Sequence, residues 1–222
     1  WQSWKEQHEV TFCKTKVSYE VRDVQLGNND FVHTHCYLPL VSESGASGLP
    51  LVCLHGFGNG SGQYYAALPA LSEGWPGPVY AIDSPGCALS SRPKWKKGSS
   101  CSIQDAEAFF ADRFEAWRQE LGLDRFCLLG HSIGAILAVT YAERYPSVVD
   151  RLILVGPAGV PQQPDDADAR RRRIPWYYRL VMALWKQGWS PFDAVRWGPG
   201  QRYMRSYVRR RFRQGSWKDE EA

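Results

Sequence analysis

The pentapeptide Gly-His-Ser-Ile-Gly at 130–134 constrains the fold of this chain more than any other stretch. A mostly apolar run at 125–129 precedes it and small, apolar residues at 135–142 follow, a pattern that predicts a buried strand, a tight turn and a helix. A serine on such a turn is a nucleophile elbow. The glycines fit because side chains beside a strained turn would collide with neighbouring elements. A helix starting at Ile133 would direct its positive end at Ser132, where negative charge develops during acyl transfer.

A second glycine-rich loop, H-G-F-G at 55–58, follows the apolar strand predicted at 49–54. Loops of this form after a third strand contribute one half of an oxyanion hole. We therefore expect the backbone N–H groups of Phe57 and Ile133 to bind an oxyanion formed at Ser132. The residues that support this motif are His55, Gly56, Gly58, Gly130, His131 and Gly134. Taken alone, the loop also fits a plain glycine-rich turn with a structural histidine.

A third segment, 79–93, predicts a strand that ends in a D-x-x-G-x-x-x-S-x-R-P loop. Three such segments in this order resemble the α/β-hydrolase superfamily, and the finer similarity is to its lipid-acting branch, the abhydrolase domain-containing proteins 4 and 5. The finer similarity is carried by 90–93, 106–118, 145–155 and 191–200. It extends from about residue 10 to 213. It departs at Cys87-Ala88, where an aromatic–glycine pair is usual, and at Ala135, where a second glycine is common.

The expected fold is an α/β-hydrolase fold, with a mostly parallel, doubly wound sheet of strands 1–6 followed by the start of a helical lid. We assign 1–160 to the N-terminal part of the core and 161–222 to the basic, Trp-rich beginning of the lid. With 222 residues, 44% of them apolar, the chain can bury one sizeable core. Two antiparallel strands are predicted in the first forty residues. Further strands are predicted at 79–82 and 151–155, and helices at 63–72 and 103–121.

The helix predicted at 103–121 has Ser102 as its N-cap and an apolar stripe that we assign to the core. The stripe consists of Ile103, Ala106, Phe110, Phe114, Trp117 and Leu121. In the strand 31–38, His33 and His35 share the face opposite to Val32 and Cys36. Two histidines at this spacing suit a metal, but no third ligand is apparent. We expect no metal and no organic cofactor.

The catalytic acid and base of a triad are not present in this chain. The order on this fold is serine, acid, histidine, and no histidine follows His131. We interpret the chain as a fragment cut within the lid, inactive without a downstream Asp and His. Asp165, Asp166 and Asp168 are the acids nearest the sixth strand, but a run of aspartates beside prolines is usually a solvated linker, which is the favoured interpretation. The H-x-x-x-x-D pattern that the resemblance links with acyl transfer is also absent.

The end of the chain is strongly basic and rich in tryptophan. Residues 161–217 hold thirteen Lys and Arg against four Asp and Glu, a net charge of +9 in a chain whose total is +4. Arginine beside tryptophan suits an anionic membrane surface. We therefore expect 170–213 to contact a membrane or lipid droplet, with a solvated basic helix face as the alternative. No motif for nucleic-acid binding accompanies the arginines, and we expect no such partner.

The leading hypothesis is a serine hydrolase of lipid carboxylic esters or N-acyl phospholipids, resembling a lysophospholipase or lipase. A non-catalytic lipase co-activator and a lysophosphatidic acid acyltransferase are the alternatives. The co-activator branch of the resembling family carries Asn at the nucleophile position, so Ser132 favours an enzyme. Proline-specific peptidase activity also fits the elbow, but not the lipid-branch motifs. The six cysteines show no C-x-x-C pairing and no metal spacing, which indicates a reducing, intracellular compartment. We expect a cytoplasmic protein, peripheral to membranes or lipid droplets through the basic segment 170–213.

Overall fold

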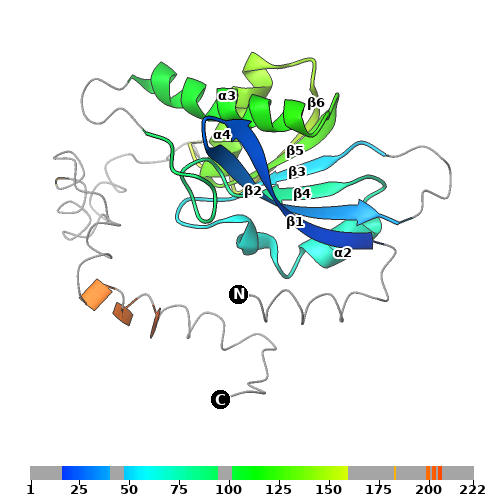
Figure 1. The fold of residues 1–222 in the computed structure, drawn as a ribbon, viewed down its shortest axis with the longest axis horizontal. Helices are drawn as coiled ribbons and strands as arrows, with labels where there is room; N and C mark the ends of the chain where they lie inside the picture. The colour runs from blue at the N-terminus through cyan, green and yellow to red at the C-terminus, as the bar shows by residue number, and fades with distance from the viewer. Residues whose placement is uncertain are drawn as a thin grey trace, which may run out of the picture. The chain divides into compact units, whose positions relative to one another are not determined.

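The computed structural model describes residues 17–40, 48–94 and 102–159, together with 183, 199–200, 202–203 and 205–206. The chain forms two compact units, Trp1–Val160 and Pro161–Ala222. Almost all described residues belong to the first unit (Figure 1). The lid and basic segment expected after residue 160 lie largely outside the described residues. No helix among the described residues is long and apolar enough to cross a membrane.

One sheet organises the first unit, and its described strands follow the order β1-β2-β4-β3-β5-β6. The strands are β1 (Val17–Gly27), β2 (Asp30–Pro39), β3 (Leu51–Leu54), β4 (Val79–Ile82), β5 (Phe126–His131) and β6 (Val149–Val155). Pairing is antiparallel from β1 to β4 and parallel among β4, β3, β5 and β6. The antiparallel start and the mostly parallel remainder confirm the fold predicted from the sequence.

Apolar side chains cover both faces of the sheet, as a doubly wound arrangement requires. The helices α3 (Ile103–Glu120) and α4 (Ile133–Arg144) pack on one face, and α2 (Leu68–Gly74) covers the other (Figure 1). The two central strands β3 and β4 are buried along their whole length. The thiols of Cys53 and Cys127 are buried and free, and they pack as small apolar side chains in these strands.

The helices differ from the sequence prediction at 63–72 and at Ile103, and agree with it at the N-cap Ser102. The helix predicted at 63–72 is wrong: a 3-10 turn η1 (Ser61–Tyr64) and the separate helix α2 replace it, with Pro69 in the first turn of α2. Ser102 caps α3 as predicted, and a reciprocal bond with Asp105 completes a capping box. Ile103, however, is 73% exposed and does not belong to the core. It occupies the first position of α3, where the helix overhangs the sheet.

Candidate active site

Ser132 occupies a strained turn between β5 and α4. Its backbone angles are φ 55° and ψ −118°, a combination that a residue with a Cβ rarely adopts. Hydrogen bonds hold this turn to the end of β6 and the loop after it. The Ser132 N–H donates to the Val155 carbonyl at 3.1 Å, and the Ser132 carbonyl accepts from Ala158 N–H at 3.1 Å. The sharp strand–turn–helix geometry of a nucleophile elbow is therefore present where the sequence predicts it.

The two glycines of the elbow are required by close backbone contacts. A Cβ on Gly130 would lie 2.4 Å from the Gly134 carbonyl oxygen and 2.6 Å from Cα of Ala135. A Cβ on Gly134 would lie 2.6 Å from the carbonyl oxygens of both Leu54 and His55. Because these neighbours are backbone atoms, they cannot rotate away as a side chain can. The second glycine thus lets α4 approach the end of β3 closely.

Parallel pairing of β3 with β5 brings the H-G-F-G loop to the elbow. A Cβ on Gly56 would lie 3.2 Å from Cβ of Ser132 and 2.8 Å from Nδ1 of His131. The backbone of Gly56 therefore packs directly against the side of the nucleophile turn. An oxyanion hole needs both donors to face the same reacting carbonyl, and this packing brings the loop that carries Phe57 to the turn that precedes Ile133.

A tight turn presents Phe57 at the centre of the loop. The Asn59 N–H donates to the Gly56 carbonyl at 3.3 Å, and Gly58 has a φ of 73° at the third turn position. These are the features of a type II turn, in which the third position favours glycine. The Phe57 side chain is 54% exposed, and the neighbouring Ile133 is 38% exposed at the first position of α4.

His55 orients the peptide group that precedes Phe57. The Ser84 N–H donates to Nε2 of His55 at 3.0 Å, so the neutral ring carries its proton on Nδ1, which lies 2.8 Å from the Gly56 carbonyl oxygen. In a trans peptide the C=O and the following N–H point in opposite directions. Fixing the Gly56 carbonyl therefore fixes the direction of the Phe57 N–H. His55 is only 3% exposed, so this histidine is a structural support rather than a base.

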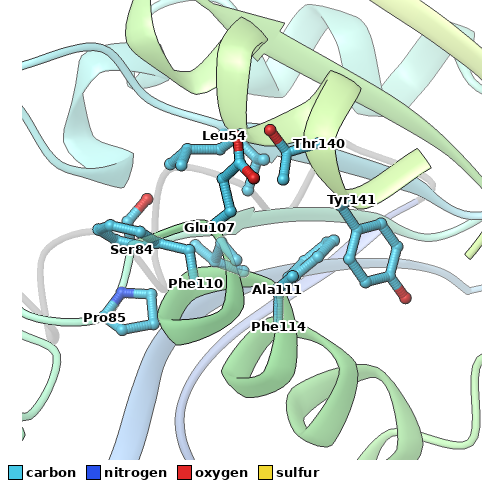
Figure 2. A pocket seen from close by; sticks show the side chains of 11 residues that line it. Leu54, Ser84, Pro85, Glu107, Phe110, Ala111, Phe114, Thr140 and Tyr141 are labelled. Carbon is cyan, nitrogen blue, oxygen red and sulfur yellow. The ribbon is translucent and has the colours of Figure 1, made fainter. Parts of the chain in front are cut away.

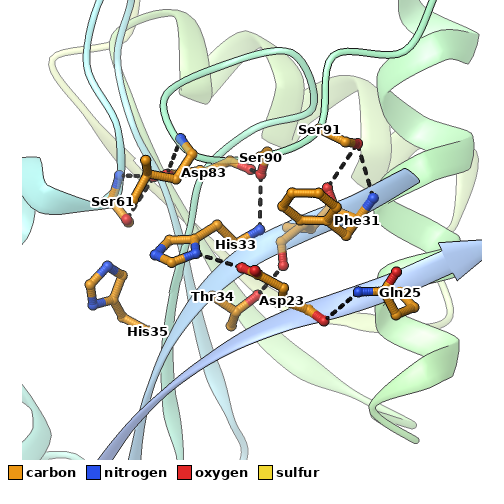
Figure 3. A network of polar contacts seen from close by, with 12 residues as sticks. Asp23, Gln25, Phe31, His33, Thr34, His35, Ser61, Asp83, Ser90 and Ser91 are labelled. Atoms are coloured by element: carbon orange, nitrogen blue, oxygen red, sulfur yellow. Dashed lines mark hydrogen bonds and ion pairs between the residues drawn. The ribbon is translucent and has the colours of Figure 1, made fainter. Parts of the chain in front are cut away.

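Asp83 anchors the far end of the same loop (Figure 3). Its Oδ1 accepts from the Ser61 N–H at 2.5 Å and from the Ser61 hydroxyl at 2.6 Å, and its Oδ2 accepts from Leu89 N–H at 2.9 Å. The carboxylate is buried, and both its oxygens are engaged. Asp83 begins the D-x-x-G loop after β4, so this loop and the H-G-F-G loop brace each other.

His33 and His35 lie on one face of β2, as predicted, with ring centroids 5.3 Å apart. Each is engaged by a protein group. Nδ1 of His33 lies 2.7 Å from a carboxylate oxygen of Asp23 (Figure 3), and Nδ1 of His35 lies 2.6 Å from the hydroxyl of Tyr19. Burial, followed by the neighbouring His33, lowers the pKa of His35 to about 4. Across the described ranges, no group of three or more side chains is arranged to hold a metal ion.

An apolar pocket lies between α3 and α4, above the ends of β3 and β4 (Figure 2). Its lining consists of Leu54, Ile82, Ser84, Pro85, Glu107, Phe110, Ala111, Phe114, Leu137, Thr140 and Tyr141. Neither Ser132 nor Phe57 belongs to this lining. The pocket adjoins the H-G-F-G loop, because Ser84 lines the pocket while its N–H donates to His55.

The structure places the backbone of Gly56 against Ser132 and shows close backbone contacts at Gly130 and Gly134. The roles of Ser132 as nucleophile and of the Phe57 and Ile133 N–H groups as oxyanion donors stay predictions. His131 packs beneath Gly56, and its Nδ1 is buried. The three aspartates considered as catalytic acids, Asp165, Asp166 and Asp168, lie outside the described residues. Sequence reasoning missed the supports of the oxyanion loop, Gln63 and Asp83. The only signal for Asp83 in the sequence was its place as the first residue of the D-x-x-G-x-x-x-S-x-R-P motif.

This geometry agrees with the comparison to known families. The family model described as the alpha/beta hydrolase fold matches residues 50–187, and the chain belongs to this family. The chain is 37% identical over 191 residues to the 1-acylglycerol-3-phosphate O-acyltransferase ABHD5 of Rattus norvegicus, over 86% of this chain and 50% of the relative. It is 32% identical over 205 residues to the (lyso)-N-acylphosphatidylethanolamine lipase of Mus musculus, over 86% of this chain and 58% of the relative.

These two relatives confirm the resemblance to the lipid-acting branch. The chain spans about half the length of the curated relatives it matches. Among solved structures, a putative acyltransferase from Salmonella enterica has a TM-score of 0.59 and 19% identity, covering 86% of this chain and 57% of that one. At this identity the likeness supports the fold alone.

Proposed function

We propose that this chain carries the nucleophile half of a serine hydrolase that acts on lipid carboxylic esters or N-acyl phospholipids. The observation that carries the proposal is the juxtaposition of Ser132, on its strained turn, with the backbone of Gly56. A strained turn persists only where the surrounding structure holds it, and such strain gathers at functional sites. The lipase named among the relatives supports a lipid substrate.

In the proposed reaction, the Ser132 hydroxyl attacks the acyl carbon of the lipid and passes its proton to a base. The carbonyl oxygen becomes an oxyanion, which the N–H groups of Phe57 and Ile133 stabilise. The leaving group departs with a proton, and water then hydrolyses the acyl-enzyme to release the acid and restore the serine. No histidine follows Ser132 in this sequence, and none of its residues is proposed as the base.

Labelling with a fluorophosphonate tests this proposal on the complete product of the gene. We expect one covalent adduct on Ser132, located by peptide mass spectrometry, and its loss in Ser132→Ala. Residues 1–222 alone should label at least about a thousandfold more slowly, because a serine without its base is a weak nucleophile. Absence of an adduct on the folded complete protein would refute a serine hydrolase.

Acyl transfer to a lysophospholipid is the second candidate, because relatives of mouse, rat and rice are named as acyltransferases or probable acyltransferases. The same oxyanion hole would serve an acyl-CoA thioester, with a lysophosphatidate hydroxyl replacing water as the acceptor. Incubation with radiolabelled acyl-CoA and lysophosphatidate separates the two reactions. Labelled phosphatidate would support transfer, whereas labelled free acid alone would support hydrolysis.

We further propose that the basic segment 170–213 brings the protein to an anionic lipid surface. The support is its composition, since arginine and tryptophan are the residue types that favour a negatively charged membrane interface. Flotation with vesicles of phosphatidylcholine, with and without phosphatidylserine, tests this. Binding should depend on the anionic lipid, weaken with added salt, and decline when Arg170, Arg171, Arg172 and Arg173 are replaced by serine.

A further inference from the structure

One side chain outside the family motifs contacts both ends of the oxyanion turn. The Oε1 atom of Gln63 accepts a hydrogen bond from the Gly56 N–H at 3.1 Å and a second from Nδ2 of Asn59 at 3.0 Å. Because the Gly56 N–H can only donate, the oxygen rather than the nitrogen of the Gln63 amide must face it. A single carbonyl oxygen therefore spans the turn that holds Phe57.

Gln63 is itself held in place on both sides. It lies on η1, where its N–H donates to the Gly60 carbonyl at 2.9 Å. The preceding Ser61 is fixed by Asp83, and the following Tyr64 donates from its hydroxyl to the Leu54 carbonyl at 2.8 Å. The side chains of Ser61, Gln63 and Tyr64 thus each fix part of this loop. Of the three, Gln63 is the one that bonds to the turn around Phe57.

We propose that Gln63 is a positioning residue of the oxyanion hole. This rests on the proposed serine-hydrolase function. His55 fixes the carbonyl of Gly56 from one side, and Gln63 fixes the N–H of the same residue from the other. With both ends of Gly56 held, the next peptide group, which carries the Phe57 N–H, has one orientation relative to Ser132. A neutral amide also suits this place, since a carboxylate would add negative charge beside the developing oxyanion.

Two variants separate positioning from simple structural support. Gln63→Leu keeps the size of the side chain and removes the acceptor, and Gln63→Glu keeps the acceptor and adds a charge. In the complete product of the gene, we expect Gln63→Leu to lower kcat for a p-nitrophenyl ester about tenfold to a hundredfold with KM within about twofold, because the donor acts on the transition state. The rate of fluorophosphonate labelling at Ser132 should fall in parallel. Gln104→Leu, at an exposed glutamine at the start of α3, is the matched control and should change neither.

Amide hydrogen exchange gives a readout independent of turnover. The Gly56 amide should be protected in the wild type, lose protection in Gln63→Leu and regain it in Gln63→Glu, while the amides of β3 stay protected in all three. If Gln63→Leu does not fold, Asn59→Ala takes its place, since it removes one of the two donors and should lower kcat by a smaller factor.

The failures of the two proposals can be told apart. A wild-type protein that does not label at Ser132 refutes the hydrolase function and the role of Gln63 with it. A wild-type protein that labels normally, beside a folded Gln63→Leu that labels within twofold of it, overturns the role of Gln63 alone. An unprotected Gly56 amide in the wild type also overturns it.

Discussion

Replacing Ser132 by glycine should stabilise the protein, because Ser132 is held at a φ of 55° and a ψ of −118°. Strain of this kind costs about 1–3 kcal/mol for a residue with a Cβ. Glycine relieves it but adds roughly 0.5–1 kcal/mol of conformational freedom to the unfolded chain. The difference leaves Ser132→Gly more stable than Ser132→Ala by about 1 kcal/mol. Alanine is the reference because it removes the hydroxyl and keeps the Cβ.

Urea unfolding followed by tryptophan fluorescence measures this difference, and thermal unfolding should give a midpoint higher by about 2–4 °C for Ser132→Gly. The control is Ala142→Gly in α4, where the backbone is helical and glycine should cost roughly 0.5–1 kcal/mol. A Ser132→Gly protein that is no more stable than Ser132→Ala would refute the reasoning, because it would mean that the turn stores no strain.

Three further predictions concern stability. Gly134→Ala should cost about 1–3 kcal/mol in urea unfolding, since its Cβ would meet two backbone oxygens at 2.6 Å, while Gly62→Ala, with nothing within 4 Å, should be nearly neutral. Burial lowers the pKa of His35 from 6.5 to about 4, so the unfolded chain binds the proton at a higher pH than the folded chain does. The folded state should therefore lose up to about 3 kcal/mol of stability as the pH falls from 6.5 to 4. A pH–stability curve that His35→Gln leaves unchanged in this range would contradict this. The Arg118 guanidinium lowers the pKa of Glu115, so its contribution is present above pH 4.5 and is lost as the pH falls below that value. Glu115→Gln should therefore cost about 2 kcal/mol at pH 7 and flatten the acid limb of the urea midpoint, and an unchanged midpoint at pH 7 would argue against the ion pair.

The sequence was sufficient for the features that local physics dictates. Apolar runs predicted the strands. Gly130 and Gly134, set between an apolar run and a run of small residues, predicted the strand, turn and helix of the elbow. The antiparallel start of the sheet followed from two adjacent strands with a short connection. These features depend on near neighbours in the chain, which a single sequence displays directly.

The supports of the oxyanion loop could not be predicted in the same way. Asp83 bonds Ser61 across 22 positions, and Ser84 bonds His55 across 29. Such pairs are decided by which strands lie side by side, and the pairing of β4 with β3 joins segments that are distant in the sequence. The helix predicted at 63–72 failed for a related reason. Side-chain bonds from Ser61 and Gln63 to the loop hold a 3-10 turn where apolar spacing alone favours a continuous helix.

The hydrogen bonds between the elbow and the end of β6 have a mechanical consequence. Val155 and Ala158 hold the N–H and the carbonyl of Ser132, and the chain leaves the sheet immediately after them. A displacement of the end of β6 would therefore act on the backbone of Ser132 through these two hydrogen bonds. The end of β6 thus couples any movement of this strand directly to the turn at Ser132.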